Sequence, residues 1–204
     1  IEKKINSQRV ATSWLTRGVL PVPLKHKSKQ PISAKGWNKL RVTKETIPDF
    51  FINGNNVGGL WGEPSSWIVD IDLDWEEAAD VAHHLLPPTF IYGRRSRPET
   101  HYLYRCKDIP TMKWTCPTGT DHAHKTIVEI RSTGSQSVLP PSIHPDNERY
   151  QIDEDDEILS ITPEELKYRV NQVAGAAVFL KYFPESGGRH DYFHIVTGCL
   201  LHSG

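Results

Sequence analysis

The stretch WIVDIDLD, residues 67–74, places three carboxylates among apolar residues. β-Branched and aromatic residues predict a strand, and strand side chains alternate between faces, so Asp70, Asp72 and Asp74 would share one face. Like charges on one face repel each other. Asp74 has a structural explanation as a helix N-cap, with Glu77 three residues later. Asp70 and Asp72 are left as candidate ligands for a hard cation, or as two aspartates at an exposed strand end.

A third acid, Glu129, lies in the apolar stretch TIVEIR, residues 126–131. One acid in a predicted strand is a weak signal, but Asp-x-Asp in one strand and Glu in another is a stronger one. A Mg²⁺ or Mn²⁺ ion that is bound by few carboxylates commonly takes its remaining ligands from substrate phosphates. We therefore expect Asp70, Asp72 and Glu129 to hold two such ions in a phosphoryl-transfer site.

The stretch GRRSRPETH, residues 93–101, supplies candidate phosphate ligands. Arg94, Arg95 and Arg97 fall in a predicted loop at 93–100, and guanidinium groups bind phosphate bidentately. His101 opens the next predicted strand and is placed to donate to a phosphate oxygen. The alternative is a solvated basic hairpin with a structural histidine.

Zinc-type side chains occur at Cys106, Cys116, His122 and His124, although their spacing matches no standard zinc pattern. We keep a zinc site on these four residues as one possibility and no metal as the other. His122 and His124 also resemble the His-hydrophobe-His motif of rolling-circle nucleases, although their neighbours predict a loop where that motif needs a strand.

Charge is strongly segregated, although the formal net charge is only −1. Residues 1–44 contain eleven Lys and Arg and one acid, whereas residues 45–90 contain nine acids and neither Lys nor Arg. This pattern is compatible with a basic surface for a polyanion beside an acidic pocket for cations, or with clustered solvated faces. The apolar stretches are too short for a membrane span, the N-terminal residues lack an apolar signal region, and three scattered cysteines form no disulfide framework, so we expect a cytoplasmic protein.

The elements that would position these residues predict an α+β fold. Helices are expected at 6–17, near 43–52, from 76 to 86, at 162–182 and at 189–202, and strands at 19–24, 56–62, 67–73, 89–92, 101–106 and 126–131. We assign residues 1–158 to a catalytic domain and 159–204 to a helical extension. Because the sequence stops inside a helical pattern, we expect a fragment with further domains in the full-length protein.

In this order the motifs resemble the bifunctional primase-polymerase (Prim-Pol) domain of the archaeo-eukaryotic primase superfamily. The resemblance spans about residues 8–155. It is carried by KQPISAKGW, NVGGLWG, VDIDLD, THYLY, IVEIR and LPPSIHPDNERY. Two departures are visible: Pro98-Glu99-Thr100 stand where the family usually has Ser or Gly-Gly before the histidine, and the third acid is Glu129 rather than Asp.

The resemblance implies a mixed, RRM-like sheet with packed helices and gives each motif a role. It implies that Asp70, Asp72 and Glu129 hold the two metal ions and, with His101, are catalytic. The nucleotide-binding residues it implies are Arg94, Ser96, Arg97, His101, Arg131 and Lys35. The basic N-terminal segment is expected to contact nucleic acid through Lys25, Lys27, Lys29 and Lys39.

The expected function is a DNA primase-polymerase that transfers nucleotides from dNTPs or NTPs to a 3′-OH on a DNA template and primer. Two alternatives stay open. A His-x-His metal-dependent nuclease or replication initiator predicts a covalent tyrosine–DNA adduct. A non-catalytic nucleic-acid-binding module predicts that Asp70→Ala changes nothing measurable.

Overall fold

The computed structural model describes residues 4–116, 125–184 and 187–194 and is α+β, as the sequence predicts. Its helices are α1 (Ser7–Thr16), α2 (Ile47–Phe50), α3 (Glu76–Leu85) and α4 (Pro163–Lys181). The strands are β1 (Leu20–Leu24), β2 (Asn56–Leu60), β3 (Ile68–Leu73), β4 (Phe90–Arg94), β5 (Arg97–Arg105), β6 (Met112–Thr115), β7 (Thr126–Arg131), β8 (Gln136–Val138), β9 (Tyr150–Glu154) and β10 (Leu159–Ser160). Residues 189–194 are helical, and the rest of the helix expected at 189–202 lies outside the described residues.

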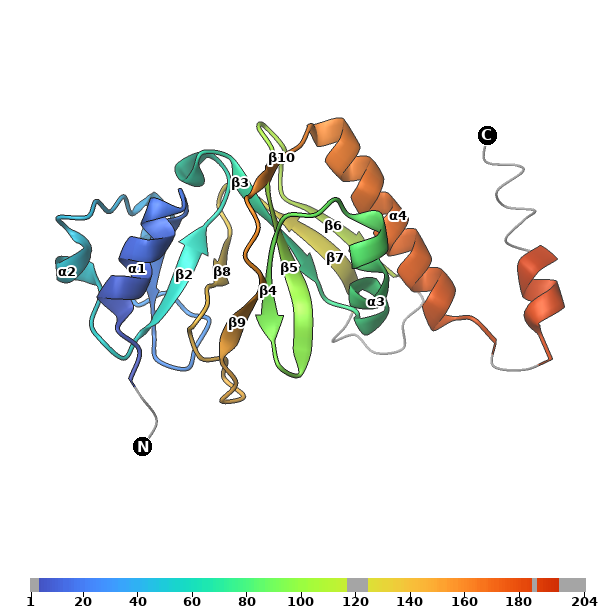
Figure 1. Cartoon of the computed structure of the whole chain (residues 1–204), viewed down its shortest axis with the longest axis horizontal. Helices are drawn as coiled ribbons and strands as arrows, with labels where there is room; N and C mark the ends of the chain where they lie inside the picture. The colour runs from blue at the N-terminus through green and yellow to red at the C-terminus, as the bar shows by residue number, and fades with distance from the viewer. Residues whose placement is uncertain (1–3, 117–124, 185–186, 195–204) are drawn as a thin grey trace.

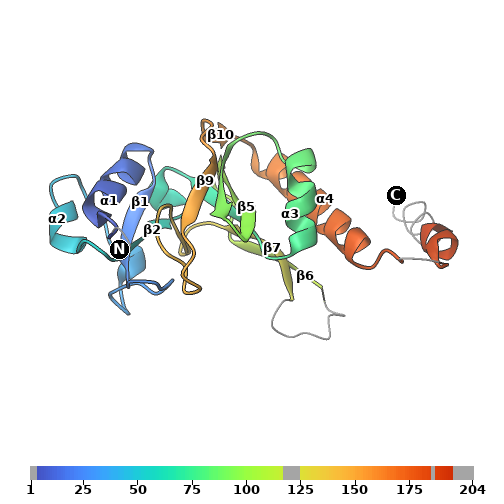
Figure 2. The same ribbon diagram turned by 60° about the horizontal axis from the view of Figure 1, so that its bottom comes forward.

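Two sheets form the framework (Figure 1). The smaller sheet is antiparallel, in the order β1-β2-β8, and the larger follows the order β6-β7-β3-β5-β4-β9. The short strand β10 extends the larger sheet by pairing in parallel with the end of β5. Helices α1 and α2 lie with the smaller sheet, and α3 and α4 cover the opposite side of the larger sheet (Figure 2).

Alternation along β3 divides the core in two. Val69, Ile71 and Leu73 pack with α3 and α4, whereas Ile68 packs with α1 and the smaller sheet. Asp70 and Asp72 share the parity of Ile68, so they point away from α3 and α4. The carboxylates therefore lie on the face of the larger sheet that meets the smaller one.

Helices α1 and α4 begin at the capping residues that the sequence indicates. The Asn6 side chain accepts from the Arg9 backbone N–H at 3.0 Å, and Gly18, with φ of +89°, follows the last residues of α1. The Thr162 side chain accepts from the Glu165 N–H at 3.2 Å and caps α4. Helix α4 begins beyond the predicted boundary at 158 and nevertheless packs its apolar side into the core under β7.

The loop predicted at 93–100 is wrong. Strand β4 continues to Arg94 and β5 begins at Arg97, so only Arg95 and Ser96 form the turn of a β-hairpin. The glycine and proline that suggested a loop mark a bulge instead: the pairing shifts register between Tyr92 and Arg94. Glycine in a strand commonly marks such a bulge or a close approach of backbones.

Candidate active site

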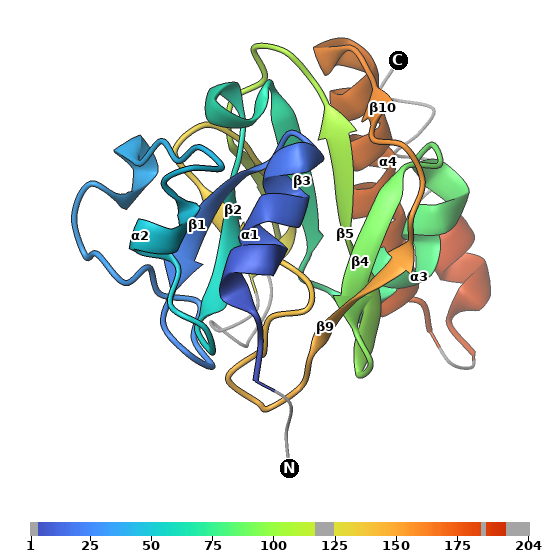
Figure 3. The same cartoon turned by 60° about the vertical axis from the view of Figure 1, so that its left-hand side comes forward.

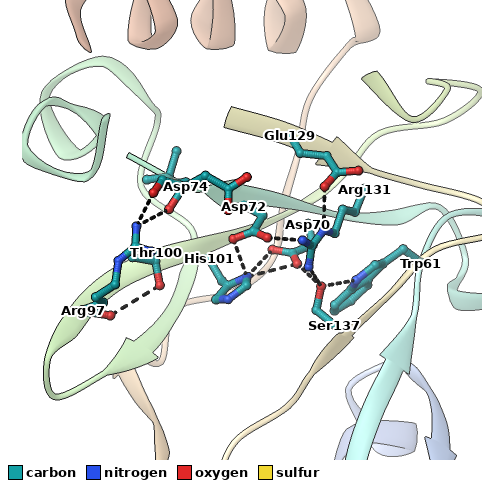
Figure 4. A network of polar contacts seen from close by, with 11 residues as sticks. Trp61, Asp70, Asp72, Asp74, Arg97, Thr100, His101, Glu129, Arg131 and Ser137 are labelled. Atoms are coloured by element: carbon teal, nitrogen blue, oxygen red, sulfur yellow. Dashed lines mark hydrogen bonds and ion pairs between the residues drawn. The ribbon is translucent and has the colours of Figure 1, made fainter. Parts of the chain in front are cut away.

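The register of three strands brings the predicted residues into one group. Asp72 on β3 lies opposite His101 on β5 and opposite Glu129 on β7. Asp70, two residues earlier, lies opposite Arg131. Directly opposed residues of an antiparallel pair project from the same face. All five side chains therefore converge on one patch of the larger sheet (Figure 4).

Asp70 is fully buried. Both of its carboxylate oxygens lie 3.1 Å from His101 Nδ1. The Ser137 hydroxyl on β8 donates to it from the smaller sheet. The indole N–H of Trp61 in turn donates to Ser137 at 3.0 Å, so this carboxylate joins the two sheets.

Arg131 is the cation at the centre of the group. Its guanidinium forms an ion pair with Asp72 and a second one with Glu129, where Nε lies 3.1 Å from Oε2. It also donates to the Ser137 hydroxyl at 3.0 Å. Burial alone would lower the pKa of Arg131, but Asp72, Asp70 and Glu129 outweigh burial and raise that pKa. Arg131 is thus the counter-ion of the acids, and its expected role in nucleotide binding stays a prediction.

His101 and Asp72 influence each other's ionisation. Burial alone would lower the pKa of His101, but the carboxylates of Asp70 and Asp72 reverse this and raise it. Burial alone would raise the pKa of Asp72, but Arg131 and His101 lower it. The imidazole is held in place by Tyr92, whose ring stacks on it at 4.4 Å with an interplanar angle of 5°. The site therefore favours a charged His101 beside an ionised Asp72.

Asp74 belongs to the site, and its predicted role as the N-cap of α3 is wrong. Helix α3 begins at Glu76, with Trp75 at the N-cap position and no side-chain cap. The Asp74 N–H instead donates to the Ile127 carbonyl at 3.0 Å, which keeps the residue beside β7. Burial, and then the charge of Asp72, raise the pKa of Asp74 to about 6. The capping signal in the sequence concealed this fourth carboxylate.

A cavity of about 240 Å³ opens beside the acids. Its lining residues are Lys29, Asp72, Leu73, Asp74, Arg94, Arg97, Thr100, His101, Arg131, Gln136, Ser137, Val138 and Tyr150. Four of the six predicted nucleotide-binding residues are among them. The cavity thus has carboxylates on one wall and cations on the others, which suits an anionic ligand that arrives with metal ions.

The cations of the cavity are held in different ways. Arg97 Nη2 donates to the backbone carbonyls of Leu73 and Asp74, at 2.9 and 2.8 Å, and so fixes the end of β3. Arg94 lies 3.0 Å from His144 Nδ1 and 3.5 Å from a Glu148 oxygen. Arg97 therefore shapes the cavity through the backbone, whereas Arg94 is held by side chains of the 144–148 turn.

Lys29 reaches the cavity from the basic loop of the smaller sheet. Its ammonium group is partly desolvated there, which lowers its pKa, although the negative charge of Asp72 acts in the opposite direction. The sequence placed Lys29 on the nucleic-acid path and Lys35 in the nucleotide site. In the structure Lys29 lines the cavity, and Lys35 is exposed outside that lining.

Several predicted residues lie away from the cavity. Ser96 is at the tip of the β4–β5 hairpin, where its hydroxyl donates to Glu148. Lys25 donates to the Gln30 side chain at 3.2 Å, and Lys27 and Lys39 also lie outside the lining. The cavity also includes Ser137 and Tyr150, which the sequence analysis did not assign to a site; only the position of Tyr150 at the end of the last shared motif pointed to it.

The four zinc-type residues are only partly described. Cys106 and Cys116 are buried in the apolar core, and burial raises the pKa of the Cys106 thiol to about 11. A neutral thiol is a poor zinc ligand. His122 and His124, on which the nuclease alternative also depends, lie outside the described residues. A zinc site here stays a prediction.

The carboxylate group suits divalent cations in its chemistry. Oxygen ligands are those that Mg²⁺ and Mn²⁺ prefer, and three acids bring more negative charge than Arg131 alone can neutralise. As the described side chains lie, no three His, Cys, Asp or Glu residues are close enough together to hold an ion. The guanidinium of Arg131 pairs with both Asp72 and Glu129, so an ion bound by these acids would displace the guanidinium or share the acids with it.

Comparison with known proteins gives one family match. Within the described part of the chain, no helix combines the length and apolar character that crossing a membrane requires. No curated protein matches the chain. Residues 11–166 match the family described as bifunctional DNA primase/polymerase, N-terminal, and this match covers the acids, the cavity and the start of α4. The chain therefore belongs to the bifunctional DNA primase/polymerase (Prim-Pol) family.

Proposed function

We propose that the chain is a template-dependent nucleotidyltransferase that synthesises or extends primers. The 3′-OH of a primer or initiating nucleotide attacks the α-phosphate of an incoming dNTP or NTP; a new P–O bond forms and pyrophosphate leaves. The observation that carries the proposal is the convergence of Asp70, Asp72 and Glu129 beside a cavity lined with cations. The family match supports the same reading.

We assign two sets of side chains to two parts of the substrate; of the three acids, Asp72 lines the cavity, and Asp70 and Glu129 lie beside it. Asp70, Asp72 and Glu129 would hold Mg²⁺ or Mn²⁺, which when bound neutralises phosphate charge and lowers the pKa of an attacking hydroxyl. The cationic face would hold the triphosphate, through Lys29 and Arg94 in the cavity lining. Charged groups fixed before the substrate arrives need no reorganisation during the reaction.

His101 would contact the phosphates from the floor of the cavity. Its Nδ1 is engaged by Asp70, and its ring is fixed by stacking on Tyr92. Its raised pKa favours the charged imidazolium, which is the form that attracts phosphate oxygens. Asp70 therefore acts both as a metal ligand and as the group that orients this histidine.

The test is incubation with template, Mn²⁺ and labelled nucleotides, with and without a primer. We expect incorporation by the parent chain and a loss of at least 100-fold in Asp72→Asn, the order expected when a main electrostatic contributor is removed. Asp80→Asn is the matched control, because Asp80 is an exposed acid on α3. Parental activity in Asp72→Asn would contradict the proposal, provided that both variants unfold cooperatively.

A further inference from the structure

A second cavity, of about 940 Å³, lies between α1 and β9, next to the catalytic cavity. It is lined by Lys4, Ile5, Asn6, Arg9, Val10, Ser13, Trp14, Arg17, Pro140, Pro141, Arg149, Tyr150, Gln151 and Ile152. We call this cavity the α1–β9 groove. Figure 3 shows both elements on the face turned to the viewer. Its volume is at the upper end of the roughly 300–1,000 Å³ typical of ligand pockets.

The charge of the groove has one sign. Its lining includes four basic residues, Lys4, Arg9, Arg17 and Arg149, and no acidic residue in the part of the chain that the structure describes. Arg17 forms an ion pair at 2.8 Å with Asp155, outside the lining. Lys4 and Arg9 are exposed, and Arg9 stands on the outer surface of α1. An acid-free, basic groove attracts a polyanion.

The groove also has apolar residues in its lining. The Trp14 indole donates to the Pro140 carbonyl at 2.8 Å, which fixes the ring below the groove. Ile152 on β9 keeps 41% of its surface exposed, although isoleucine normally packs inside. Trp14 itself is buried, so the apolar contact that the groove offers to unstacked bases is the exposed side chain of Ile152.

Tyr150 connects the groove to the active site. It lines both the α1–β9 groove and the catalytic cavity, and its ring centroid lies 6.1 Å from that of His101. The side chain of Tyr150 therefore separates a ligand in the groove from the catalytic cavity. A ligand of the groove and a nucleotide in the cavity would be neighbours.

We propose that the α1–β9 groove binds single-stranded nucleic acid, as the path of the unpaired template next to the active site; this inference rests on the proposed function. Sites for single strands combine a basic groove that follows the phosphates with side chains, commonly aromatic, that contact the bases; here the exposed Ile152 would contact the bases. A duplex hides its base faces, so only its phosphates would meet the groove, and the exposed Ile152 would have no ligand group to cover it. Lys4 and Arg9 would contact the phosphates.

The test measures binding of a fluorescent single-stranded 15-mer as a function of salt. In the double variant Lys4→Gln/Arg9→Gln we expect about 10-fold weaker binding near physiological salt. The log–log salt slope should fall by about 1.4, because each neutralised contact to a single strand contributes about 0.7. The matched control is Lys107→Gln/Lys167→Gln, since Lys107 follows β5 and Lys167 lies on α4, both outside the groove lining.

A second variant tests the apolar contact independently of the basic residues. Ile152→Asp places a carboxylate in the groove at a half-exposed position that tolerates a polar side chain, and we expect it to weaken binding several-fold as well. Affinity and slope equal to the parent in both variants would overturn the proposal. An equal loss of affinity for a blunt duplex of the same length would overturn the single-strand assignment.

The proposed function is measured separately, as nucleotide incorporation by the parent chain. Absence of incorporation would contradict the nucleotidyltransferase, but it would leave an effect of Lys4 and Arg9 on oligonucleotide affinity intact. Conversely, incorporation by a parent chain whose affinity does not depend on these residues would leave the enzyme standing and overturn the groove.

Discussion

Arg131 explains how buried acids of neighbouring strands can lie side by side on one face of the larger sheet. Asp72 and Glu129 are each about 8% exposed, and two buried carboxylates at neighbouring positions would repel each other strongly. The guanidinium pairs with both and is itself held in the charged form. The protein without ligand thus carries an internal cation where we propose that metal ions bind. Binding of those ions must displace Arg131 or share the acids with it.

Ser137 gives the first prediction at this scale. Its hydroxyl contacts Asp70, Trp61 and Arg131, so Ser137→Ala removes three hydrogen bonds and leaves the buried indole N–H of Trp61 without its described partner. We expect this substitution to cost about 1–3 kcal/mol of unfolding free energy. Urea denaturation measures it.

Ser132 is the matched control for that substitution. It is also buried, and among the described residues its hydroxyl has no hydrogen-bond partner. Ser132→Ala therefore removes no bond and should be neutral or slightly stabilising. Equal losses in the two alanine variants would show that the hydroxyl of Ser137 does not hold the acid group together.

Asp74 predicts a pH effect on stability. Its folded-state pKa is raised from 3.8 to about 6, so the folded protein binds this proton more tightly than the unfolded chain. The stability that results is fully present below about pH 4 and is lost as the pH rises through about 6. Asp74→Asn cannot ionise. It should therefore gain stability relative to the parent as the pH rises from 4 to 7.

The expected gain is on the order of 1 kcal/mol after allowance for the partial exposure of Asp74. For a chain of this size, that corresponds to about 2–4 °C in melting temperature. Thermal melts of both proteins at pH 4 and pH 7, without divalent ions, give the measurement. A stability difference that is the same at both values would mean that Asp74 titrates normally.

At the scale of elements, the bulge in the β4–β5 hairpin sets the position of His101. A Cβ at Gly93 would lie 2.6 Å from the Arg97 carbonyl oxygen and 2.7 Å from the Glu99 nitrogen, both of which are backbone atoms. Gly93→Ala should therefore push the two strands apart and cost about 1–3 kcal/mol of unfolding free energy. We also expect weaker nucleotide binding, because β5 carries the histidine.

Gly175 provides the opposite case in α4. A Cβ there would have nothing within 4 Å, and the residue is exposed in the middle of a helix. Gly175→Ala should therefore stabilise the protein by roughly 0.5–1 kcal/mol. Chemical denaturation of both alanine variants decides the point, and a stabilised Gly93→Ala would show that the hairpin backbone is free to relax.

Six of the ten strands that the structure describes were predicted, all but β7 with shifted ends, whereas β6, β8, β9 and β10 were not predicted. Alternation located β3 and β7, and the capping pattern at Thr162 located α4, because these signals depend on neighbouring residues. The turn at 95–96 was missed because glycine and proline indicate both loops and bulges. The same local reasoning assigned Asp74 to a helix cap, whereas its backbone is held by Ile127 in a strand distant in sequence.

For the site residues too, local sequence signals could be predicted and contacts between distant segments could not. Asp70, Asp72 and Glu129 could be found because acids in apolar strands are unusual, and His101 because of the motif that it opens. That Lys29 rather than Lys35 reaches the cavity, and that Ser137 contacts Asp70, depends on how the smaller sheet packs on the larger one. No spacing in the sequence encodes that packing.

At the scale of the whole molecule, the site lies where the two sheets meet, and residues of both sheets contribute to it. Asp70 and Asp72 belong to the larger sheet, whereas Ser137 comes from the smaller one and Trp61 directly follows its strand β2. A ligand that binds the acids therefore contributes to holding both halves of the fold. Binding to the folded state alone stabilises a protein by about 2.7 kcal/mol when the ligand is present at 100 times its Kd.

Mn²⁺ should accordingly raise the melting temperature by about 5–10 °C at that saturation, because 1 kcal/mol corresponds to about 2–4 °C. Excess chelator should reverse the rise. Asp72→Asn should lose most of this rise in melting temperature and Asp80→Asn should keep it.

Arg131→Gln should be less stable than the parent without Mn²⁺ and should show a larger rise in melting temperature with it. The reason is that the ion then replaces the only guanidinium that pairs with Asp72 among the described contacts. A parental shift in Asp72→Asn would place the ion elsewhere, and a smaller shift in Arg131→Gln would mean that the guanidinium supports the ion instead of competing with it.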